Sequence, residues 1–348
     1  MNEIKAPKQP VPLNIKEDIL RVDGLKMYFP VTKGLLKRTV GYVKAVDDVS
    51  FTVRRGQTLG IVGESGCGKS TLGKAVMRRL RPSEGDIIFN GRNVSQADAK
   101  ALRSYHKDMQ MITQDPYTAL DPRMSIRDII LEGIHIQKGD KGMTAKQKDE
   151  LVIRMLEMVG LSAQHADRFP HEFSGGQRQR INIARALAVS PAFLICDEIV
   201  SALDVSIQAQ IVSLMTEIQR ELGLTYIFIG HDLSVVRHVS DQVAVMYLGK
   251  FVELTDSDEL YAHPLHPYTK ALISAAPIPD PEADLARERI LLEGEVPSPI
   301  NPPKGCNFCT RCPHATSLCH EKEPEYKEVR PGHYVACHRV REGGEWVG

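Results

Sequence analysis

The sequence lacks several features that would place it in common functional classes. It has no excess of either charge, because 44 Lys and Arg residues balance 44 Asp and Glu residues in a chain of 348. Affinity for duplex nucleic acid comes largely from excess Lys and Arg, so this balance argues against a free-standing nucleic-acid-binding protein. No apolar run approaches the roughly 20 residues that a membrane helix needs. The polar, Pro-containing residues 1–18 have no apolar core of a signal peptide, so we expect a cytoplasmic chain.

Cysteine is also scarce, and it is unevenly placed. Seven cysteines occur, and five of them follow residue 305. In a reducing cytoplasm, clustered cysteines indicate metal or redox chemistry more often than disulfides. The remaining composition, 42% hydrophobic and 25% charged, is typical of globular protein, and the length leaves room for about two domains.

The order of the apolar segments predicts an α/β fold. Strands that alternate with helices imply a mostly parallel sheet covered on both faces. We expect strands at 19–29, 43–53, 58–62, 193–196, 225–229 and 243–248, and helices at 69–80, 174–189 and 207–222. Seven prolines between residues 277 and 303 indicate a linker. The expected organisation is an N-terminal tail at 1–18, a main domain at 19–276, a Pro-rich linker at 277–303 and a Cys-rich tail at 304–348.

A phosphate-binding motif occupies residues 63–71. The segment GESGCGKST fits the pattern G-x-x-x-x-G-K-[ST] and lies between an apolar strand and a helix, the context that the motif requires. Glycines let successive backbone N–H groups point at phosphate oxygens, and the helix start adds its positive dipole end. We expect Lys69 to reach the β- and γ-phosphates and Ser70 to ligate Mg²⁺. The expected phosphate-binding residues are Gly63, Ser65, Gly66, Cys67, Gly68, Lys69, Ser70 and Thr71.

Two further segments complete a nucleotide site. Asp197 ends an apolar strand, where it is expected to hold Mg²⁺, and the adjacent Glu198 is expected to polarise an attacking water. An ordinary strand end could carry the same pair, but the phosphate loop about 130 residues upstream favours the catalytic interpretation. The segment FSGGQ at 173–177 precedes a predicted helix, so Ser174 and the helix N–H groups form a second anion site.

Together these segments resemble the ATPases of ABC transporters, with Phe in place of the usual leading Leu of their signature. The resemblance implies a P-loop ATPase with a mixed-sheet core, an antiparallel β subdomain and a helical subdomain at about 115–190. It also implies that the signature closes on ATP bound by an opposite subunit. The signature residues are Ser174, Gly175, Gly176 and Gln177.

The same resemblance implies roles for further residues. Gln114 matches the Q-loop residue that touches Mg²⁺ and the attacking water and senses the membrane partner. Asp204 matches the D-loop, which communicates across the dimer, and His231 matches the switch histidine that contacts the γ-phosphate. Tyr42 is the expected adenine-stacking aromatic, with Phe29 as the alternative.

Three segments narrow the resemblance to the ATPase subunits of oligopeptide and dipeptide importers: SALDVSIQAQ at 201–210, HDLSVVR at 231–237 and HPLHPYT at 263–269. The chain is most similar to the second, F-type ATPase of a heteromeric pair. The implied partners are a second homologous ATPase, two integral membrane permeases and, through them, an external peptide-binding protein. The implied location is peripheral, at the cytoplasmic face of the cell membrane. Alternatives are a nickel or glutathione importer, a non-transport ABC ATPase of translation or DNA repair, and an iron–sulfur electron carrier with a vestigial ATPase.

The late cysteines allow two kinds of site. Their spacing alone predicts Cys306, Cys309 and Cys312 as ligands of a soft metal or an iron–sulfur cluster. The family resemblance instead implies that Cys306, Cys312, Cys319 and Cys337 hold a [4Fe–4S] cluster, as in some members, and that Cys309 is a bystander. A structural zinc site is the nearest alternative, followed by unbound thiols. The implied cofactors are therefore ATP, Mg²⁺ and a cluster or zinc.

Overall fold

The computed structural model describes residues 17–34, 38–137, 141–276 and 289–347, and the chain forms two compact units. Unit 1 contains residues 17–20, Val53–Gln57 and Gln96–Tyr226, and unit 2 contains Arg21–Thr52, Thr58–Ser95 and Ile227–Gly348. Most of the expected N-terminal tail and the first part of the expected linker, residues 277–288, lie outside the described residues. The expected domain boundaries stay predictions.

Unit 2 contains a four-stranded sheet in the order β2-β1-β4-β5. The strands are β1 (Asp18–Lys33), β2 (Arg38–Arg54), β4 (Glu84–Phe89) and β5 (Arg92–Asn93). The second half of β2 alternates buried and exposed residues, the pattern of a strand with one face packed. Both expected N-terminal strands are therefore present, and each is longer than the sequence pattern indicated.

A second sheet in unit 2 carries the phosphate loop. β9 (Gln242–Tyr247) runs parallel to β3 (Thr58–Val62) and antiparallel to β10 (Lys250–Asp256). β10 pairs with β12 (His333–Val335), which pairs with β11 (Lys327–Arg330), both antiparallel. Every residue of β3 is buried, as expected for a strand covered on both faces.

The described part of unit 2 also contains several short helices. They are α1 (Lys69–Val76), α8 (Leu233–Val239), α9 (Ser257–Ala262), α10 (Pro267–Ala275) and α12 (Ser317–Glu321), with a 3₁₀ turn at Glu342–Gly344. α1 ends at Val76, whereas the sequence pattern predicted a helix to residue 80. Arg78 has a left-handed φ of 56°, and a helix does not continue through such a residue.

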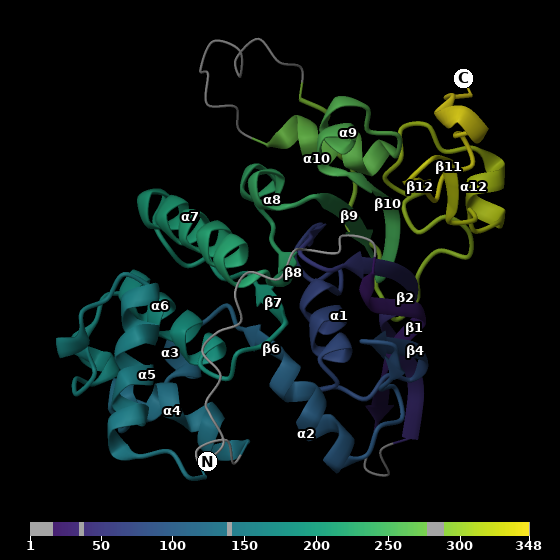
Figure 1. The fold of residues 1–348 in the computed structure, drawn as a ribbon. Helices are drawn as coiled ribbons and strands as arrows, with labels where there is room; N and C mark the ends of the chain where they lie inside the picture. Colours follow the sequence, from purple (N-terminus) through teal and green to yellow (C-terminus); the bar gives the residue numbers. More distant parts are fainter. Residues whose placement is uncertain (1–16, 35–37, 138–140, 277–288, 348) are drawn as a thin grey trace. The chain divides into compact units, whose positions relative to one another are not determined.

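Unit 1 is mainly helical. Its parallel strands β6 (Met109–Ile112) and β7 (Phe193–Asp197) pair directly, and α2 (Ala99–Asp108) leads into β6. α6 (Gly175–Leu187) contacts α3 (Pro116–Ala119), α4 (Ile126–Ile136) and α5 (Ala145–Met158), and these helices form one group in Figure 1. Two 3₁₀ turns, Ala163–His165 and Pro170–Glu172, precede α6, and α7 (Val205–Leu222) packs on it.

The fully buried strand β8 (Thr225–Ile229) carries the chain from unit 1 into unit 2. None of the helices in the described part of the chain has the length and apolar character required to span a bilayer.

Candidate nucleotide site and cysteine-rich tail

The phosphate loop in unit 2 has a backbone that requires glycine. Gly63, Gly66 and Gly68 all have positive φ, at 154°, 77° and 114°, values that other residues rarely adopt. A Cβ atom on Gly68 would lie 2.0 Å from the carbonyl oxygen of Ala45, and one on Gly63 would lie 2.2 Å from that of Met246. The loop therefore packs closely against neighbouring backbone at both Gly63 and Gly68.

Lys69 is held inside this loop, with only 4% of its surface exposed. Its Nζ donates to the carbonyl oxygens of Gly63 at 2.7 Å and Glu64 at 3.0 Å. These acceptors are neutral, so the ammonium keeps its charge available for an anion. α1 begins at Lys69, and its N-terminal N–H groups add to the attraction. Burial raises the pKa of the nearby Cys67 thiol, so this cysteine is a protonated packing residue.

His231 also lies in unit 2, exposed and directly after β8. The N–H of Gly230 donates to the carbonyl oxygen of Ile61 at 3.1 Å. This bond places the residue before His231 beside β3, the strand that leads into the phosphate loop. On the other side, Asp232 caps α8 by accepting from the N–H of Ser234 at 2.8 Å. The structure thus brings His231 and the phosphate loop to the same end of unit 2.

The expected catalytic carboxylates lie in unit 1. Asp197 is buried at the end of β7, and Glu198 has a left-handed φ of 51°, which costs a non-glycine residue about 1–3 kcal/mol. The carbonyl oxygen of Glu198 accepts from Ser201 Oγ at 2.9 Å, and Ser201 Oγ accepts from Gln114 Nε2 at 3.2 Å. One hydrogen-bonded chain therefore links the segment of the expected catalytic carboxylates with the expected D-loop and Q-loop segments.

The signature segment begins a helix as expected. Ser174 Oγ accepts from the N–H of Gln177 at 3.4 Å, and Gln177 Oε1 accepts from the N–H of Ser174 at 3.1 Å, which forms a capping box. A Cβ atom on Gly176 would lie 2.6 Å from Cγ2 of Ile207, so this glycine permits the close packing of α6 and α7. Asp204 caps α7 by accepting from the N–H of Ile207 at 3.1 Å.

The aromatic candidates for adenine stacking lie in the four-stranded sheet. Tyr42 on β2 is 51% exposed, whereas Phe29 on β1 is partly buried. An exposed ring is free to stack on a base, so Tyr42 stays the prediction.

Comparison with known proteins identifies the family. A family model described as "ABC transporter" matches residues 46–201, and one described as "Oligopeptide/dipeptide transporter, C-terminal region" matches residues 252–319. The oligopeptide transport ATP-binding protein AppF of Bacillus subtilis (strain 168) is 55% identical over 324 residues, which cover 93% of this chain and 98% of that protein. The chain belongs to the ATP-binding proteins of ABC transporters. The expected fold class, with its antiparallel β subdomain, is confirmed.

Two further matches agree with this assignment of the ABC ATPase. The oligopeptide transport ATP-binding protein OppF of Bacillus subtilis (strain 168) is 50% identical over 322 residues, which cover 92% of this chain and 96% of that protein. A solved dimeric structure of the ATP-binding cassette MJ0796 bound to ADP and Pi matches the fold with a TM-score of 0.59. It is 23% identical and covers 68% of this chain and 98% of its own.

The HPLHPYT segment of this ABC ATPase is fixed by a buried carboxylate on β10. Glu253 is fully buried, and its Oε1 accepts from the N–H of Leu265 at 2.7 Å and pairs with His333 Nε2 at 2.8 Å. Its Oε2 accepts from the N–H of His266 at 2.9 Å. Two residues later, Tyr268 Oη accepts from the N–H of Glu64 at 2.9 Å. The family-specific segment therefore contacts the backbone of the phosphate loop.

The cysteine-rich tail packs on the same segment. Val329, Val335 and Val340 form a small apolar cluster with Leu265. Within the tail, the N–H of Cys306 donates to the carbonyl oxygen of Cys319 at 2.8 Å. A Cβ atom on Gly305 would lie 2.3 Å from that same oxygen, so glycine is required for this close approach.

The late thiols of the ABC ATPase occupy one region. Burial raises the pKa of Cys306 to about 12 and that of Cys337 to about 11, and neighbouring thiols, Cys319 among them, add to both shifts. Burial and then Cys319 raise the pKa of Cys312 and of Cys309 in the same direction. Soft thiolates suit a soft metal. Nevertheless, within residues 17–34, 38–137, 141–276 and 289–347, no three His, Cys, Asp or Glu side chains converge as metal ligands.

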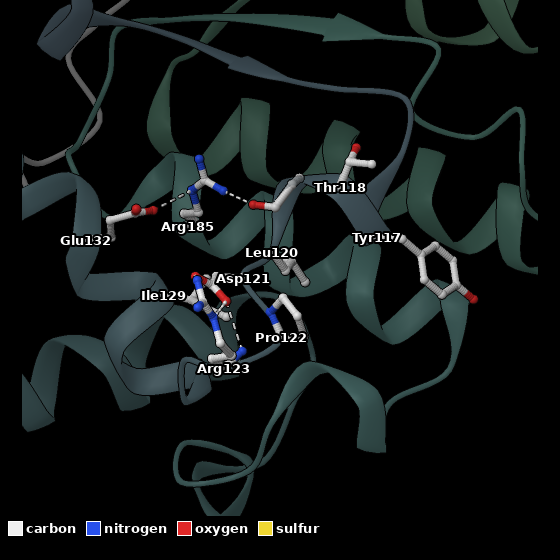
Figure 2. A pocket seen from close by; sticks show the side chains of 10 residues that line it. Tyr117, Thr118, Leu120, Asp121, Pro122, Arg123, Ile129, Glu132 and Arg185 are labelled. Atoms are coloured by element: carbon white, nitrogen blue, oxygen red, sulfur yellow. Dashed lines mark hydrogen bonds and ion pairs between the residues drawn. The ribbon is translucent and has the colours of Figure 1, made fainter.

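A groove of about 660 Å³ follows the Q-loop segment in unit 1. Arg185 crosses its wall, paired with Glu132 at 3.6 Å and donating to the carbonyl oxygen of Ala119 (Figure 2). Tyr117, drawn apart from this pair in Figure 2, is 63% exposed, and its ring centroid lies 4.2 Å from Cζ of Arg178. The lining residues are Tyr117, Thr118, Ala119, Leu120, Asp121, Pro122, Arg123, Ile129, Glu132 and Arg185.

Sequence reasoning missed one contact to the phosphate loop altogether. Arg311 of the tail binds the Glu64 carboxylate through both Nη atoms, at 2.9 to 3.1 Å. The two residues are 247 positions apart, and no local pattern marks such a pair.

Proposed function

We propose that this ATPase powers the import of di- or oligopeptides across the cell membrane, as the F-type ATPase of a heteromeric pair. AppF and OppF are oligopeptide transport proteins by name, and the matching C-terminal region is that of oligopeptide and dipeptide transporters. This match favours peptides over the nickel and glutathione alternatives. The observation that carries the ATPase role is the hydrogen-bonded chain from Gln114 through Ser201 to the strained backbone of Glu198.

The proposed chemistry is in-line attack of water on the γ-phosphate. Lys69 and the loop N–H groups stabilise negative charge on the phosphates, because they are fixed donors in a partly buried site. Glu198 orients the water, and His231 supports the γ-phosphate. Mg²⁺, which neutralises phosphate charge when bound, would be held by Ser70, Asp197 and Gln114.

The proposed active unit is a dimer of ATPases. Each chain has one phosphate loop and one signature segment, so a nucleotide between two subunits meets Ser174 of the second one. The partner is a homologous but different ATPase, and the MJ0796 cassette was solved as a dimer. Two integral membrane permeases complete the assembly and receive the external peptide-binding protein. We place their contact near Gln114, at the groove beside Tyr117. The family resemblance places this subunit at the cytoplasmic face of the membrane.

The Glu198→Gln variant tests the proposed chemistry. An amide keeps the shape of the side chain but is a poor base, so MgATP binding should persist while phosphate release falls to background. A binding titration and a phosphate-release assay on the same preparation measure both. Hydrolysis at the wild-type rate would reject the role of Glu198, and failure to co-purify with two membrane proteins would reject the transport role.

For the tail, we propose a [4Fe–4S] cluster held by Cys306, Cys312, Cys319 and Cys337, with zinc as the alternative. The proposal rests on the family resemblance of the cysteine pattern and on the soft-donor chemistry of thiolates, although the described side chains do not converge as metal ligands in this structure. Such a group would cross-link a tail whose apolar cluster is small. Metal analysis with a visible spectrum of anaerobically purified protein decides, since zinc without a brown chromophore would reject the cluster.

A further inference from the structure

Glu64 places a negative charge inside the phosphate loop. It follows Gly63 directly, and its carbonyl oxygen accepts from the Nζ of Lys69 at 3.0 Å. The carboxylate therefore belongs to the same short segment that must accept the phosphates of ATP. A like charge carried by the segment that binds an anion weakens binding unless a cation offsets it.

Arg311 supplies that cation. Its Nη1 donates to Glu64 Oε2 at 2.9 Å and to Oε1 at 3.1 Å, and its Nη2 donates to Oε1 at 3.1 Å. The side chain of Arg311 is only 8% exposed, against 29% for Glu64. A bidentate pair with this burial is stronger and better oriented than a surface ion pair. The buried Nε of Arg311 has no hydrogen-bond partner among the described residues, and its Cζ lies 6.0 Å from the ring centroid of Tyr247.

The chain around Arg311 packs against aromatic residues of β9 and α10 in unit 2. Phe308 is 1% exposed, and its ring centroid lies 5.2 Å from that of Tyr247 on β9 and 5.4 Å from that of Tyr268 on α10. Tyr268 in turn accepts from the N–H of Glu64 at 2.9 Å. Glu64 is thus held at its backbone by Tyr268 and at its carboxylate by Arg311. Tyr268 contacts the Phe308 ring, and the backbone N–H of Arg311 donates to the carbonyl oxygen of Phe308 at 3.0 Å.

We infer that Arg311 is a positioning residue for ATP binding: it reaches from the cysteine-rich tail to offset the charge of Glu64 and to fix the phosphate loop. The inference rests on the proposed ATPase function, and it adds a role for the tail that needs no metal. If charge compensation is the role of Arg311, removing the arginine harms ATP binding only while Glu64 is charged.

The test compares Arg311→Met with the double variant Arg311→Met/Glu64→Gln in the full-length chain, with Mg–AMPPNP as the probe in isothermal titration calorimetry. Arg311→Met keeps the apolar stem and removes the charge, so the dissociation constant should rise roughly three- to tenfold, the effect of one unpaired like charge near a partly exposed site. Glu64→Gln in the Arg311→Met background should bring it back to within about twofold of wild type, since no unpaired charge remains. Added salt should shrink the Arg311→Met defect by screening.

Two controls separate charge compensation from folding. Arg341→Met removes an exposed arginine of the same tail and should leave the dissociation constant unchanged. Arg311→Lys keeps the charge and loses the fork, so its affinity should lie between wild type and Arg311→Met; it carries the test if Arg311→Met does not fold.

The inference would be overturned if Glu64→Gln failed to restore the dissociation constant of Arg311→Met. It would also be overturned if Arg311→Met changed the dissociation constant no more than Arg341→Met does. Either result would leave the proposed ATP site intact. If Arg311→Lys bound Mg–AMPPNP as weakly as expected for Arg311→Met, and if added salt did not reduce this defect, the inference would also be overturned. No binding of Mg–AMPPNP by the wild-type chain would overturn the proposed ATP site itself.

Discussion

Replacing Glu253 by Gln should locally unfold the HPLHPYT segment. The carboxylate accepts three hydrogen bonds, from the backbone N–H groups of Leu265 and His266 and from His333 Nε2, and it is fully buried. A glutamine has nearly the same volume, so no cavity forms. Its amide oxygen can replace Oε1, but its NH₂ group then faces the N–H of His266, and two donors cannot bond to each other.

The expected cost follows from this single mismatch. A buried donor left without an acceptor costs about 1–3 kcal/mol, and the substituted amide brings a second such donor. We therefore expect a loss of about 2–4 kcal/mol in the local free energy of opening. Because every 1.4 kcal/mol is a factor of ten, the amides of Leu265 and His266 should exchange with solvent about 30- to 1000-fold faster.

Hydrogen–deuterium exchange with mass spectrometry on a peptide that covers residues 264–268 measures this change directly. Glu259→Gln is the comparison variant. Glu259 is 34% exposed, and its carboxylate pairs with Arg330, with His263 and, at 3.8 Å, with His333 Nδ1, whereas Glu253 accepts from two backbone N–H groups of the segment. Partly exposed pairs contribute about 0–1 kcal/mol, so exchange in the control should change little. If Glu253→Gln and Glu259→Gln gave the same exchange rates, the carboxylate would not be what fixes this segment.

Two further predictions concern the thermal stability of the chain. Gly68→Ala should lower the thermal unfolding midpoint far more than Gly66→Ala, because only at Gly68 would the new Cβ meet backbone, 2.0 Å from the Ala45 oxygen; equal midpoints by differential scanning fluorimetry would contradict the close approach. Burial lowers the pKa of His266 to about 4, so an unfolded chain takes up a proton near its ordinary pKa of about 6.5 while the folded one does not. Stability should therefore fall as pH drops from about 6.5 to 4, by up to about 3 kcal/mol, and the thermal midpoint of His266→Gln should lose less over the same range.

The parts of the site that the sequence predicted are those whose causes are local. The phosphate loop is marked by glycines whose φ values only glycine tolerates, and by the buried strand before them. Ser174 is marked because a helix start needs a side-chain acceptor at its N-cap, whereas Asp204 was found by its match to the D-loop and proves to be an N-cap as well. Spacing within a few residues is enough to reveal such features.

The parts that the sequence could not reveal depend on contacts between distant segments. Nothing near Glu253 indicates that it holds two backbone N–H groups on the following loop, since an isolated Glu in an apolar strand is usually a surface residue. The cysteine spacing alone predicted Cys306, Cys309 and Cys312, and only the family resemblance added Cys319, which a backbone hydrogen bond brings beside Cys306. The end of α1 was missed because nothing in the sequence indicates that Arg78 turns left-handed.

The neutral balance of charge agrees with the way this site handles phosphate. Lys69 and Arg311 are 4% and 8% exposed, and the charge of Arg311 is neutralised by Glu64. Lys69 and the N–H groups of the loop therefore meet the ligand. Such a site offers a few fixed donors, and the shape of the loop selects the anion. An exposed basic surface would instead bind polyanions of any kind, nucleic acids included. The pair Glu64–Arg311 therefore fixes the loop without adding net charge to it.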